Sequence, residues 1–290
     1  MWRAVPQGWD RGALVSSLMT EQGLLHFESL GRGKPLLLLH CWLGSWDFWR
    51  GTMEALSDRA VGRRIYALDF WGFGESDRRL SSYHVADYIA MVVQFMDQLG
   101  IERAPIFGHS MGGTVAMGLA VEHPQRVTRV AVVGSPMEGR SLSLLLKVAG
   151  VRWIADILWR FPPLLRFVIW GYSPWLAKDR KEVYRRMMQT LSQATVASFS
   201  ESIASLRNRD MRPHLPEVRV PVLGIYGVRD WVVHPGQALV IANLVPQAQV
   251  EIFERSGHFP MLDEPERFHQ SLLRFLLKEQ DDASGAPAGR

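Results

Sequence analysis

The sequence predicts an α/β fold: a mostly parallel, doubly wound sheet with an inserted helical cap. Three observations lead to this prediction. Short apolar or β-branched runs alternate with helical segments along most of the 290 residues, the alternation breaks once over residues 137–212, and polar residues follow several of the expected strands. Strands separated by helices pair in parallel through right-handed crossovers, so we expect helices on both faces of the sheet.

The first half of the chain supplies five expected strands and two expected helices. The strands are predicted at 21–29, 36–39, 64–69, 104–107 and 127–133, and the helices at 84–99 and 110–122. The segment 36–39 is a continuous apolar run, which is typical of a strand buried on both faces. Pro124 stops the second helix.

The alternation resumes after the insertion. A strand is predicted at 220–226, a helix at 236–244, a strand at 249–253 and a helix at 265–278. The end of the chain, 281–290, is rich in Ala, Gly and Ser and is expected to be disordered. The resulting organisation is a core formed by 1–136 and 213–280, a helical cap at 137–212 and a disordered tail.

Ser110 lies where the strand at 104–107 turns into a helix, between Gly108 and Gly112. A serine on so sharp a turn has a strained backbone that only small neighbours tolerate, and its hydroxyl stands clear of the turn. Ser110 could instead be an ordinary helix N-cap. A cap does not require glycines on both sides, so the pattern favours a nucleophile.

Polar residues at the strand ends supply partners for this serine. In open α/β sheets, ligands bind outside the carboxyl ends of the strands. Asp230 follows the strand at 220–226, and His258 follows the strand at 249–253, which gives the chain order Ser, Asp, His of a catalytic triad. His258 would act as the base and Asp230 would orient it, with Asp210 and Glu138 as alternative acids.

Several motifs in the same order make the chain resemble the α/β-hydrolase superfamily over residues 21–278. The resemblance is to its serine esterase, epoxide-hydrolase-like and cofactor-free haloperoxidase-like branch. The motifs are Leu36-Leu-Leu-Leu-His-Cys-Trp42, Asp69-Phe-Trp-Gly-Phe-Gly-Glu-Ser-Asp77, Gly108-His-Ser-Met-Gly-Gly113, Gly227-Val-Arg-Asp230 and Gly257-His-Phe-Pro-Met-Leu-Asp-Glu-Pro265. The resemblance implies that neither a metal nor an organic cofactor is used. A serine at position 110, rather than an aspartate, favours acyl chemistry over an alkyl-enzyme ester.

The same resemblance places the oxyanion-hole donors at the backbone N–H groups of Trp42 and Met111. Relatives usually carry His-Gly before the oxyanion residue, where this chain has His40-Cys41. A cysteine would be strained there if the loop requires a positive φ. We expect His40, Cys41 and His109 to shape or support the pocket, with Cys41 as a small buried apolar residue.

Composition excludes several other classes of protein. The 33 basic and 29 acidic residues are scattered, without the basic run that a nucleic-acid-binding surface needs. A single cysteine cannot form an internal disulfide. The first ten residues lack the basic segment and apolar run of a signal peptide, so the expected location is the cytoplasm.

The segment 137–212 is apolar, aromatic and basic, and it should carry the substrate information. It includes Trp153, Trp159, Trp170 and Trp175, and Pro162-Pro163 breaks it into at least two helices. Its charges are too frequent for a membrane-spanning helix. Helices that roof the active site with an apolar lining are the favoured interpretation, and an amphipathic surface that touches a membrane peripherally is the second.

These observations predict a serine hydrolase that cleaves an ester or related carboxylic derivative with a hydrophobic moiety, through an acyl-enzyme. Its partner would be a small hydrophobic substrate. The same triad could serve perhydrolysis, C–C bond cleavage or lactone hydrolysis. An alternative of another class is a binding or assembly accessory protein that keeps the fold without turnover.

Overall fold

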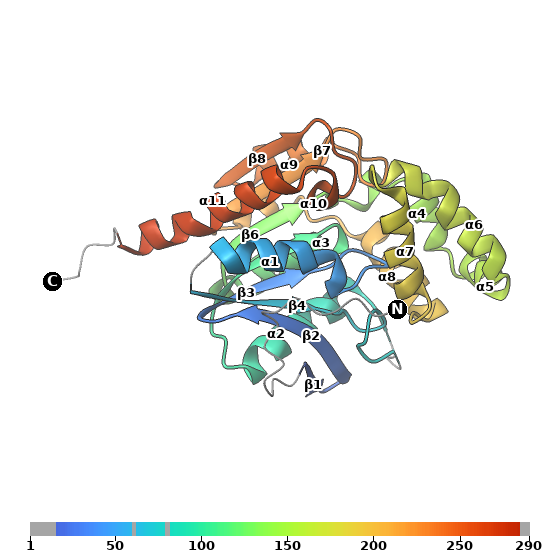
Figure 1. Ribbon diagram of the computed structural model, residues 1–290, viewed down its shortest axis with the longest axis horizontal. Coiled ribbons are helices and arrows are strands. Elements are labelled where there is room, and N and C mark those ends of the chain that lie inside the picture. The colour runs from blue at the N-terminus through green and yellow to red at the C-terminus, as the bar shows by residue number, and fades with distance from the viewer. Residues whose placement is uncertain (1–15, 60–61, 79–81, 285–290) are drawn as a thin grey trace.

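An eight-stranded sheet forms the centre of the computed structural model, which describes residues 16–59, 62–78 and 82–284 (Figure 1). The strands are β1 (Ser17–Thr20), β2 (Gly23–Gly31), β3 (Lys34–Leu39), β4 (Arg63–Leu68), β5 (Ala104–His109), β6 (Val127–Val133), β7 (Val222–Gly227) and β8 (Ala248–Phe253). Their spatial order is β1-β2-β4-β3-β5-β6-β7-β8. β1 and β2 pair antiparallel with their neighbours, whereas β3 to β8 run parallel, which confirms the predicted sheet.

Helices outside the insertion cover this sheet. They are α1 (Arg50–Arg59), α2 (Val85–Gln98), α3 (Met111–Glu122), α9 (Gln237–Leu244), α10 (Pro260–Asp263) and α11 (Pro265–Ser284). α2 packs against α3, and α1 packs against α11. Burial of the apolar stripe of α11, formed by Phe268, Leu272, Phe275 and Leu276, attaches that helix to the sheet.

Each predicted strand and helix of the core is present, with ends shifted by two residues or fewer except at the end of α11. Three core elements were not predicted, β1, α10 and α1, since β1 and α10 are four residues long and α1 is largely polar. The prediction that disorder begins at residue 281 was wrong, because α11 continues to Ser284. The sequence contains no helix-breaking residue between Pro265 and Gly285. The remainder of the predicted tail lies outside the described residues.

Five α-helices lie between β6 and β7 and form the cap at one end of the molecule (Figure 1). They are α4 (Leu144–Ala149), α5 (Arg152–Arg160), α6 (Pro162–Tyr172), α7 (Arg180–Leu191) and α8 (Val196–Asn208). Pro162 opens α6, because its missing N–H and fixed φ suit the first helical position. Of the helices that the structure describes, none is both long and apolar enough to cross a bilayer.

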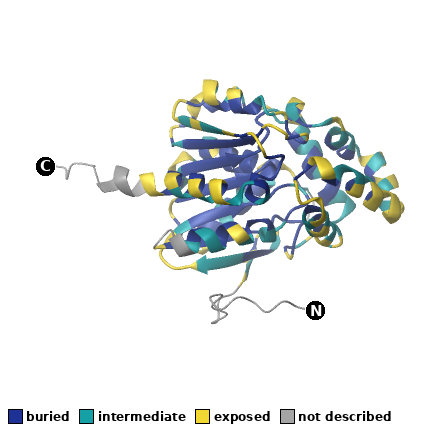
Figure 2. Ribbon diagram, turned by 45° about the horizontal axis from the view of Figure 1, so that its top comes forward, coloured by how far each residue is buried: buried dark blue, intermediate teal, exposed yellow. Residues whose placement is uncertain are grey.

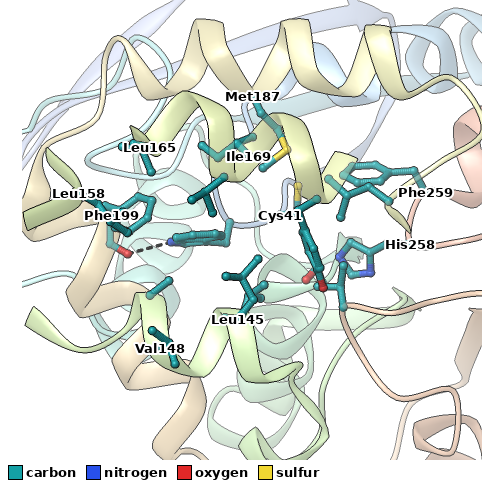
Figure 3. Close-up of a pocket in the computed structure, with 18 residues that line it drawn as sticks. Cys41, Leu145, Val148, Leu158, Leu165, Ile169, Met187, Phe199, His258 and Phe259 are labelled. Carbon is teal, nitrogen blue, oxygen red and sulfur yellow. Dashed lines mark hydrogen bonds between the residues drawn. The ribbon is translucent and has the colours of Figure 1, made fainter. Parts of the chain in front are cut away.

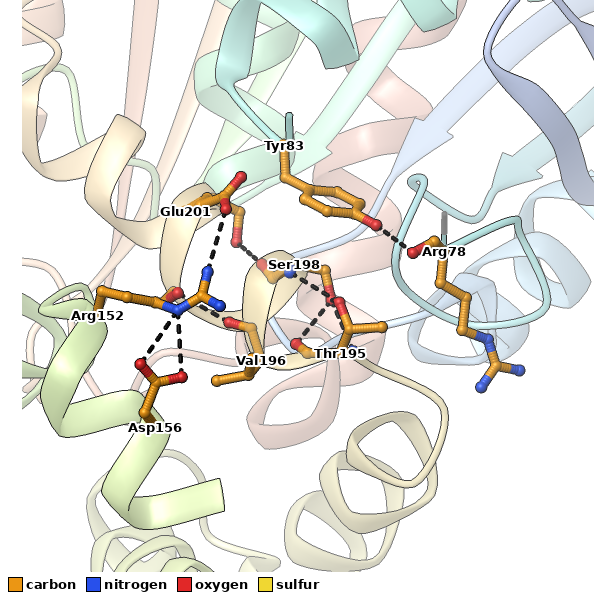
Figure 4. Close-up of polar contacts among 10 residues, drawn as sticks. Arg78, Tyr83, Arg152, Asp156, Thr195, Val196, Ser198 and Glu201 are labelled. Atoms are coloured by element: carbon orange, nitrogen blue, oxygen red, sulfur yellow. Dashed lines mark hydrogen bonds and ion pairs between the residues drawn. The ribbon is translucent and has the colours of Figure 1, made fainter. Parts of the chain in front are cut away.

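Polar contacts fix the last cap helix (Figure 4). Thr195 and Ser198 form a capping box at the start of α8, in which each side chain accepts the other's backbone N–H. Arg152 joins α5 to α8, because its guanidinium contacts Asp156 in its own helix and lies 3.3 Å from Glu201 Oε1. An ion pair therefore connects α5 with α8 at the surface of the cap.

Candidate active site

Ser110 occupies the predicted turn between β5 and α3, with φ 53° and ψ −117°. Among the described residues other than glycine, only Ser110 and Leu43 have a positive φ. The Ser110 N–H donates to the Val133 carbonyl at 2.8 Å, so β6 helps to hold the turn. Backbone strain of this kind, about 1–3 kcal/mol, persists only where the surrounding structure enforces it.

The flanking glycines allow strand and helix to meet. A Cβ at Gly108 would lie 2.2 Å from the Gly112 carbonyl oxygen, and one at Gly112 would lie 2.3 Å from the Leu39 carbonyl oxygen. Both contacts are with backbone, which cannot move aside without shifting β3 or α3. The pattern of glycines around Ser110 is thus a packing requirement of this turn.

Asp230 and His258 form a buried pair at the same edge of the sheet. His258 Nδ1 lies 2.8 Å from Asp230 Oδ2, and the two side chains are 4% and 1% exposed. Asp230 Oδ1 accepts the backbone N–H groups of Val232 and Val233 at 2.8 and 2.9 Å. The carboxylate is fixed on one side by amides, and its other oxygen fixes the imidazole, which leaves His258 Nε2 as the nitrogen for chemistry.

The other two acids considered from the sequence pair elsewhere. Asp210 Oδ2 lies 2.6 Å from Arg212 Nη2, and Glu138 Oε2 lies 2.9 Å from Arg212 Nη1. Arg212 also holds the pKa of Asp210 below its usual range through a side-chain hydrogen bond. The carboxylate that the structure brings to His258 is that of Asp230.

Ser110 and His258 line one pocket beneath the cap, together with Cys41 and Trp42 (Figure 3). Its empty volume, part of which is open to solvent, is about 740 Å³. The other lining residues are Leu145, Leu146, Val148, Ala149, Leu158, Leu165, Val168, Ile169, Tyr172, Leu176, Met187, Phe199, Val232 and Phe259. Most of them come from the cap, as expected for helices that roof an active site.

The loop after β3 differs in one respect from the expectation. The positive φ falls on Leu43 (53°) and not on Cys41, so the anticipated strain at the cysteine is absent. Trp42 is anchored to the cap, since its indole N–H donates to the Phe199 carbonyl at 2.9 Å and the two rings lie 4.7 Å apart. Met111 is the first residue of α3, where backbone N–H groups have no acceptor within the helix.

His40 and Cys41 support this loop. His40 Nε2 accepts the Phe70 N–H at 2.9 Å, so its Nδ1 carries the proton and donates to the Cys41 carbonyl at 2.7 Å. With both nitrogens used, the ring ties the ends of β3 and β4 together. Burial raises the pKa of the Cys41 thiol to about 12, which keeps it protonated and unsuited to act as a nucleophile.

His109 contacts both the backbone and the ring of His258. Its Nε2 lies 2.7 Å from the His258 carbonyl oxygen, and the two rings are 4.7 Å apart. Because a carbonyl only accepts, Nε2 must carry the proton. Burial, reinforced by repulsion from His258, holds the pKa of His109 well below its ordinary value. His109 is therefore a neutral support for His258.

Two contacts at the site were not predicted from the sequence. Asp263 accepts the N–H of Gly257, directly before His258, and the N–H of Lys178 in the cap, both at 2.7 Å. The Phe199 carbonyl accepts the Trp42 indole N–H, as described above. Asp263 lies inside the quoted motif 257–265, but its role depends on a partner 85 residues away. No local pattern reveals such a pairing.

The neutral His109 has a consequence for the pH dependence of stability. Below about pH 6.5 the unfolded chain protonates this histidine and the folded chain does not, so the free energy of unfolding falls as the pH falls, by about 1.4 kcal/mol per pH unit. His109→Gln keeps a donor for the His258 carbonyl and removes the titration. Urea unfolding at several pH values should show that the free energy of unfolding of this variant changes less steeply with pH, by the equivalent of about one bound proton. An unchanged slope would contradict the neutral assignment.

Known proteins with related sequences point to one family. The family described as "alpha/beta hydrolase fold" matches residues 34–265. A pimeloyl-[acyl-carrier protein] methyl ester esterase of Nitrosomonas europaea is 31% identical, over 84% of this chain and 96% of its own length. A 2-hydroxymuconate semialdehyde hydrolase of a Pseudomonas species is 28% identical, over 88% and 90%.

Solved structures agree on the fold. A thermophilic esterase from Thermogutta terrifontis superposes with a TM-score of 0.77 at 24% identity, covering 91% of this chain and 97% of its own. An enol-lactonase from Burkholderia xenovorans superposes with a TM-score of 0.76 at 21% identity, covering 87% and 96%. The chain belongs to the alpha/beta hydrolase fold family and is an enzyme of the hydrolase type.

Proposed function

We propose that this hydrolase cleaves carboxylic esters with a hydrophobic acyl or alcohol part, with Ser110 as nucleophile, His258 as base and Asp230 as the acid that orients the base. Two observations carry the proposal: Ser110 and His258 line the same apolar pocket, and His258 Nδ1 lies 2.8 Å from Asp230 Oδ2.

The first half of the reaction acylates the enzyme. Ser110 Oγ attacks the ester carbonyl carbon while His258 Nε2 takes the hydroxyl proton. When the tetrahedral intermediate collapses, the bond to the leaving alcohol breaks and His258 returns the proton to that oxygen. Asp230, fixed by the Val232 and Val233 amides, stabilises the imidazolium that forms in between.

The second half releases the acid. His258 takes a proton from water, whose oxygen attacks the acyl-enzyme carbonyl, and then returns a proton to Ser110 Oγ as the acid leaves. Each step uses only these side chains and water. In this proposal the backbone N–H groups of Trp42 and Met111 stabilise the oxyanion, and each such donor typically lowers the barrier by about 3–4 kcal/mol.

The pocket lining argues for a neutral substrate. Within the part of the chain that the structure describes, the pocket is lined by no Asp, Glu, Lys or Arg side chain. A carboxylate buried there would lack a partner, which is costly in an apolar site. The relative named as a methyl ester esterase supports the ester reaction. Another relative is named as a hydrolase of a 2-hydroxy-6-oxononadienedioate, a dicarboxylate, and a substrate of that charge is not matched by this lining.

A series of p-nitrophenyl esters of increasing acyl length tests the substrate class. Each buried methylene contributes about 0.8 kcal/mol, so kcat/KM should rise about fourfold per added CH₂ until the pocket is filled. The matched control is an acyl chain of equal length that ends in a carboxylate. We expect its kcat/KM to be lower by about a hundredfold, since the charge would be buried without a partner.

Three different results would contradict the proposal. A flat series, or a preference for the carboxylate-ended chain, would mean that the described pocket does not hold the acyl group. Greater turnover of a C–C substrate, a lactone or a peracid-forming mixture of acetate and peroxide would reassign the reaction while keeping the same residues. Binding of the esters without any turnover would favour a non-catalytic accessory protein.

A further inference from the structure

Helix α6 is apolar on two faces. Leu165 and Ile169 are buried and line the pocket, as does Val168. On the other side Leu164, Phe167 and Trp170 are exposed, Phe167 by 65% and Trp170 by 49%. A surface helix normally has one apolar face and one polar face. The outer face of α6 is therefore an exposed apolar surface.

This outer face continues along the chain into α5. We use the name outer cap patch for Trp153, Ile157, Phe161, Leu164, Phe167 and Trp170. The Phe167 and Trp170 rings stack at 6.0 Å between centroids with planes 28° apart. Five of the six large aromatic side chains that are exposed in the described part of the chain lie between residues 153 and 175. The sixth, Trp231, is adjacent to α6, because the Tyr172 hydroxyl donates to its carbonyl.

The outermost cap helices, α5 and α6, lie at the end of the molecule opposite the end of α11, and exposed residues are frequent there (Figures 1 and 2). This position leaves α5 and α6 accessible to a flat surface. Several large apolar side chains exposed on two neighbouring helices are typical of an interaction site.

Basic residues outnumber acidic ones in the segment that contains the outer cap patch. Residues 144–175 contain Lys147, Arg152, Arg160 and Arg166 but only one acid, Asp156, and Arg152 pairs with that acid. Arg160 and Arg166 have no ion-pair partner among the described residues. The Arg180 guanidinium lies 5.8 Å from the centre of the Trp170 ring. Long basic side chains beside tryptophans can bury their stems and reach phosphate groups at a lipid interface.

We infer that the outer cap patch docks on the surface of an anionic lipid bilayer. Trp and Phe would enter the headgroup region and the arginines would contact the lipid phosphates. A second copy of the chain fits less well, because a two-fold interface would place the same arginines against one another. Docking would bring the roof of the pocket to the source of an apolar substrate.

The cap contains a second cavity, which adjoins the catalytic pocket at Leu165. It lies between α5, α6 and α7, has an empty volume of about 900 Å³ that includes open solvent, and is lined by residues that include Trp159, Arg166 and Met188. Leu165 lines both this cavity and the catalytic pocket. The statement that docking supplies the pocket with substrate rests on the proposed function. Lipid binding itself does not, since it needs no substrate.

Flotation of the full chain with vesicles tests the inference. Wild type should float with phosphatidylcholine vesicles that contain phosphatidylserine, less with phosphatidylcholine alone, and less in high salt. The double variant Phe167→Ser/Trp170→Ser should bind at least about tenfold more weakly. Arg160→Glu/Arg166→Glu should lose the preference for phosphatidylserine. The matched control is Leu239→Ser on α9, which removes an equally exposed apolar side chain and should bind as wild type does.

Two further readouts keep the outcomes distinguishable. Thermal melting and hydrolysis of a short soluble ester should be unchanged in Phe167→Ser/Trp170→Ser, because neither residue lines the catalytic pocket. Failure of wild type to float with either vesicle, or equal loss of binding in Leu239→Ser, would overturn the inference. Dimerisation in solution that disappears in the double variant would also overturn it, since the patch would then be an interface between copies. An inactive wild type that still floats would contradict only the proposed function.

Discussion

Ser110→Ala is expected to lower kcat for a p-nitrophenyl ester by about a million-fold, the typical loss when the nucleophile of a serine triad is removed. The pocket, the His258–Asp230 pair and the backbone amides of the loop would remain, so substrate binding should change little. Alanine has no oxygen to form the acyl-enzyme, and the residual rate would come from water attack. Stopped assays with purified variant at high concentration can measure so small a rate.

Controls separate this chemical effect from unfolding. Alanine meets the same positive φ as serine, so the melting temperature should stay close to that of wild type. Ser135→Ala serves as the matched variant, because Ser135 is buried nearby and its hydroxyl donates to the Val133 carbonyl. It should retain activity. A Ser110→Ala protein with undiminished turnover would disprove the role assigned to Ser110.

Asp230→Asn is expected to lower kcat by about ten-thousand-fold. The introduced asparagine can still accept the Val232 and Val233 amides through its oxygen, which turns its NH₂ group toward His258 Nδ1. Two donors cannot face one another, so the imidazole would place its proton on Nε2. That nitrogen could then no longer accept the proton of Ser110.

The alternative acids provide the comparison for this variant. Glu138→Gln and Asp210→Asn should each keep activity within a few-fold of wild type, because both carboxylates pair with Arg212 and not with His258. A large loss in either variant, with Asp230→Asn near wild type, would show that the catalytic acid had been assigned to the wrong residue.

The sequence was sufficient to predict the sheet, the position of Ser110 and the meeting of Asp230 with His258. All three follow from one geometric fact: parallel strands end at one edge, so residues that follow β5, β7 and β8 converge even when they are far apart in the chain. The need for glycine on both sides of Ser110 could be predicted for a similar reason, since the close approach of strand and helix backbone leaves no room for a Cβ.

Contacts between the cap and the core could not be predicted. Trp42 meets Phe199 across 157 residues, and Asp263 meets Lys178 across 85, because these pairs depend on how the cap helices settle on the core. The position of the strain in the loop after β3, at Leu43 rather than Cys41, likewise depends on backbone geometry that residue types do not determine. Cap residues line the pocket, as the favoured interpretation of this segment predicts, and contact of the cap with a membrane stays a prediction.

Covalent labelling by a fluorophosphonate tests the central claim most directly, because this reagent reacts with a serine only when a neighbouring base activates it. We expect wild-type protein to be labelled stoichiometrically on the peptide that contains Ser110, as identified by mass spectrometry. Labelling should be abolished in Ser110→Ala and strongly slowed in Asp230→Asn. A folded wild-type protein that stays unlabelled, or that is labelled on another serine, would contradict the account.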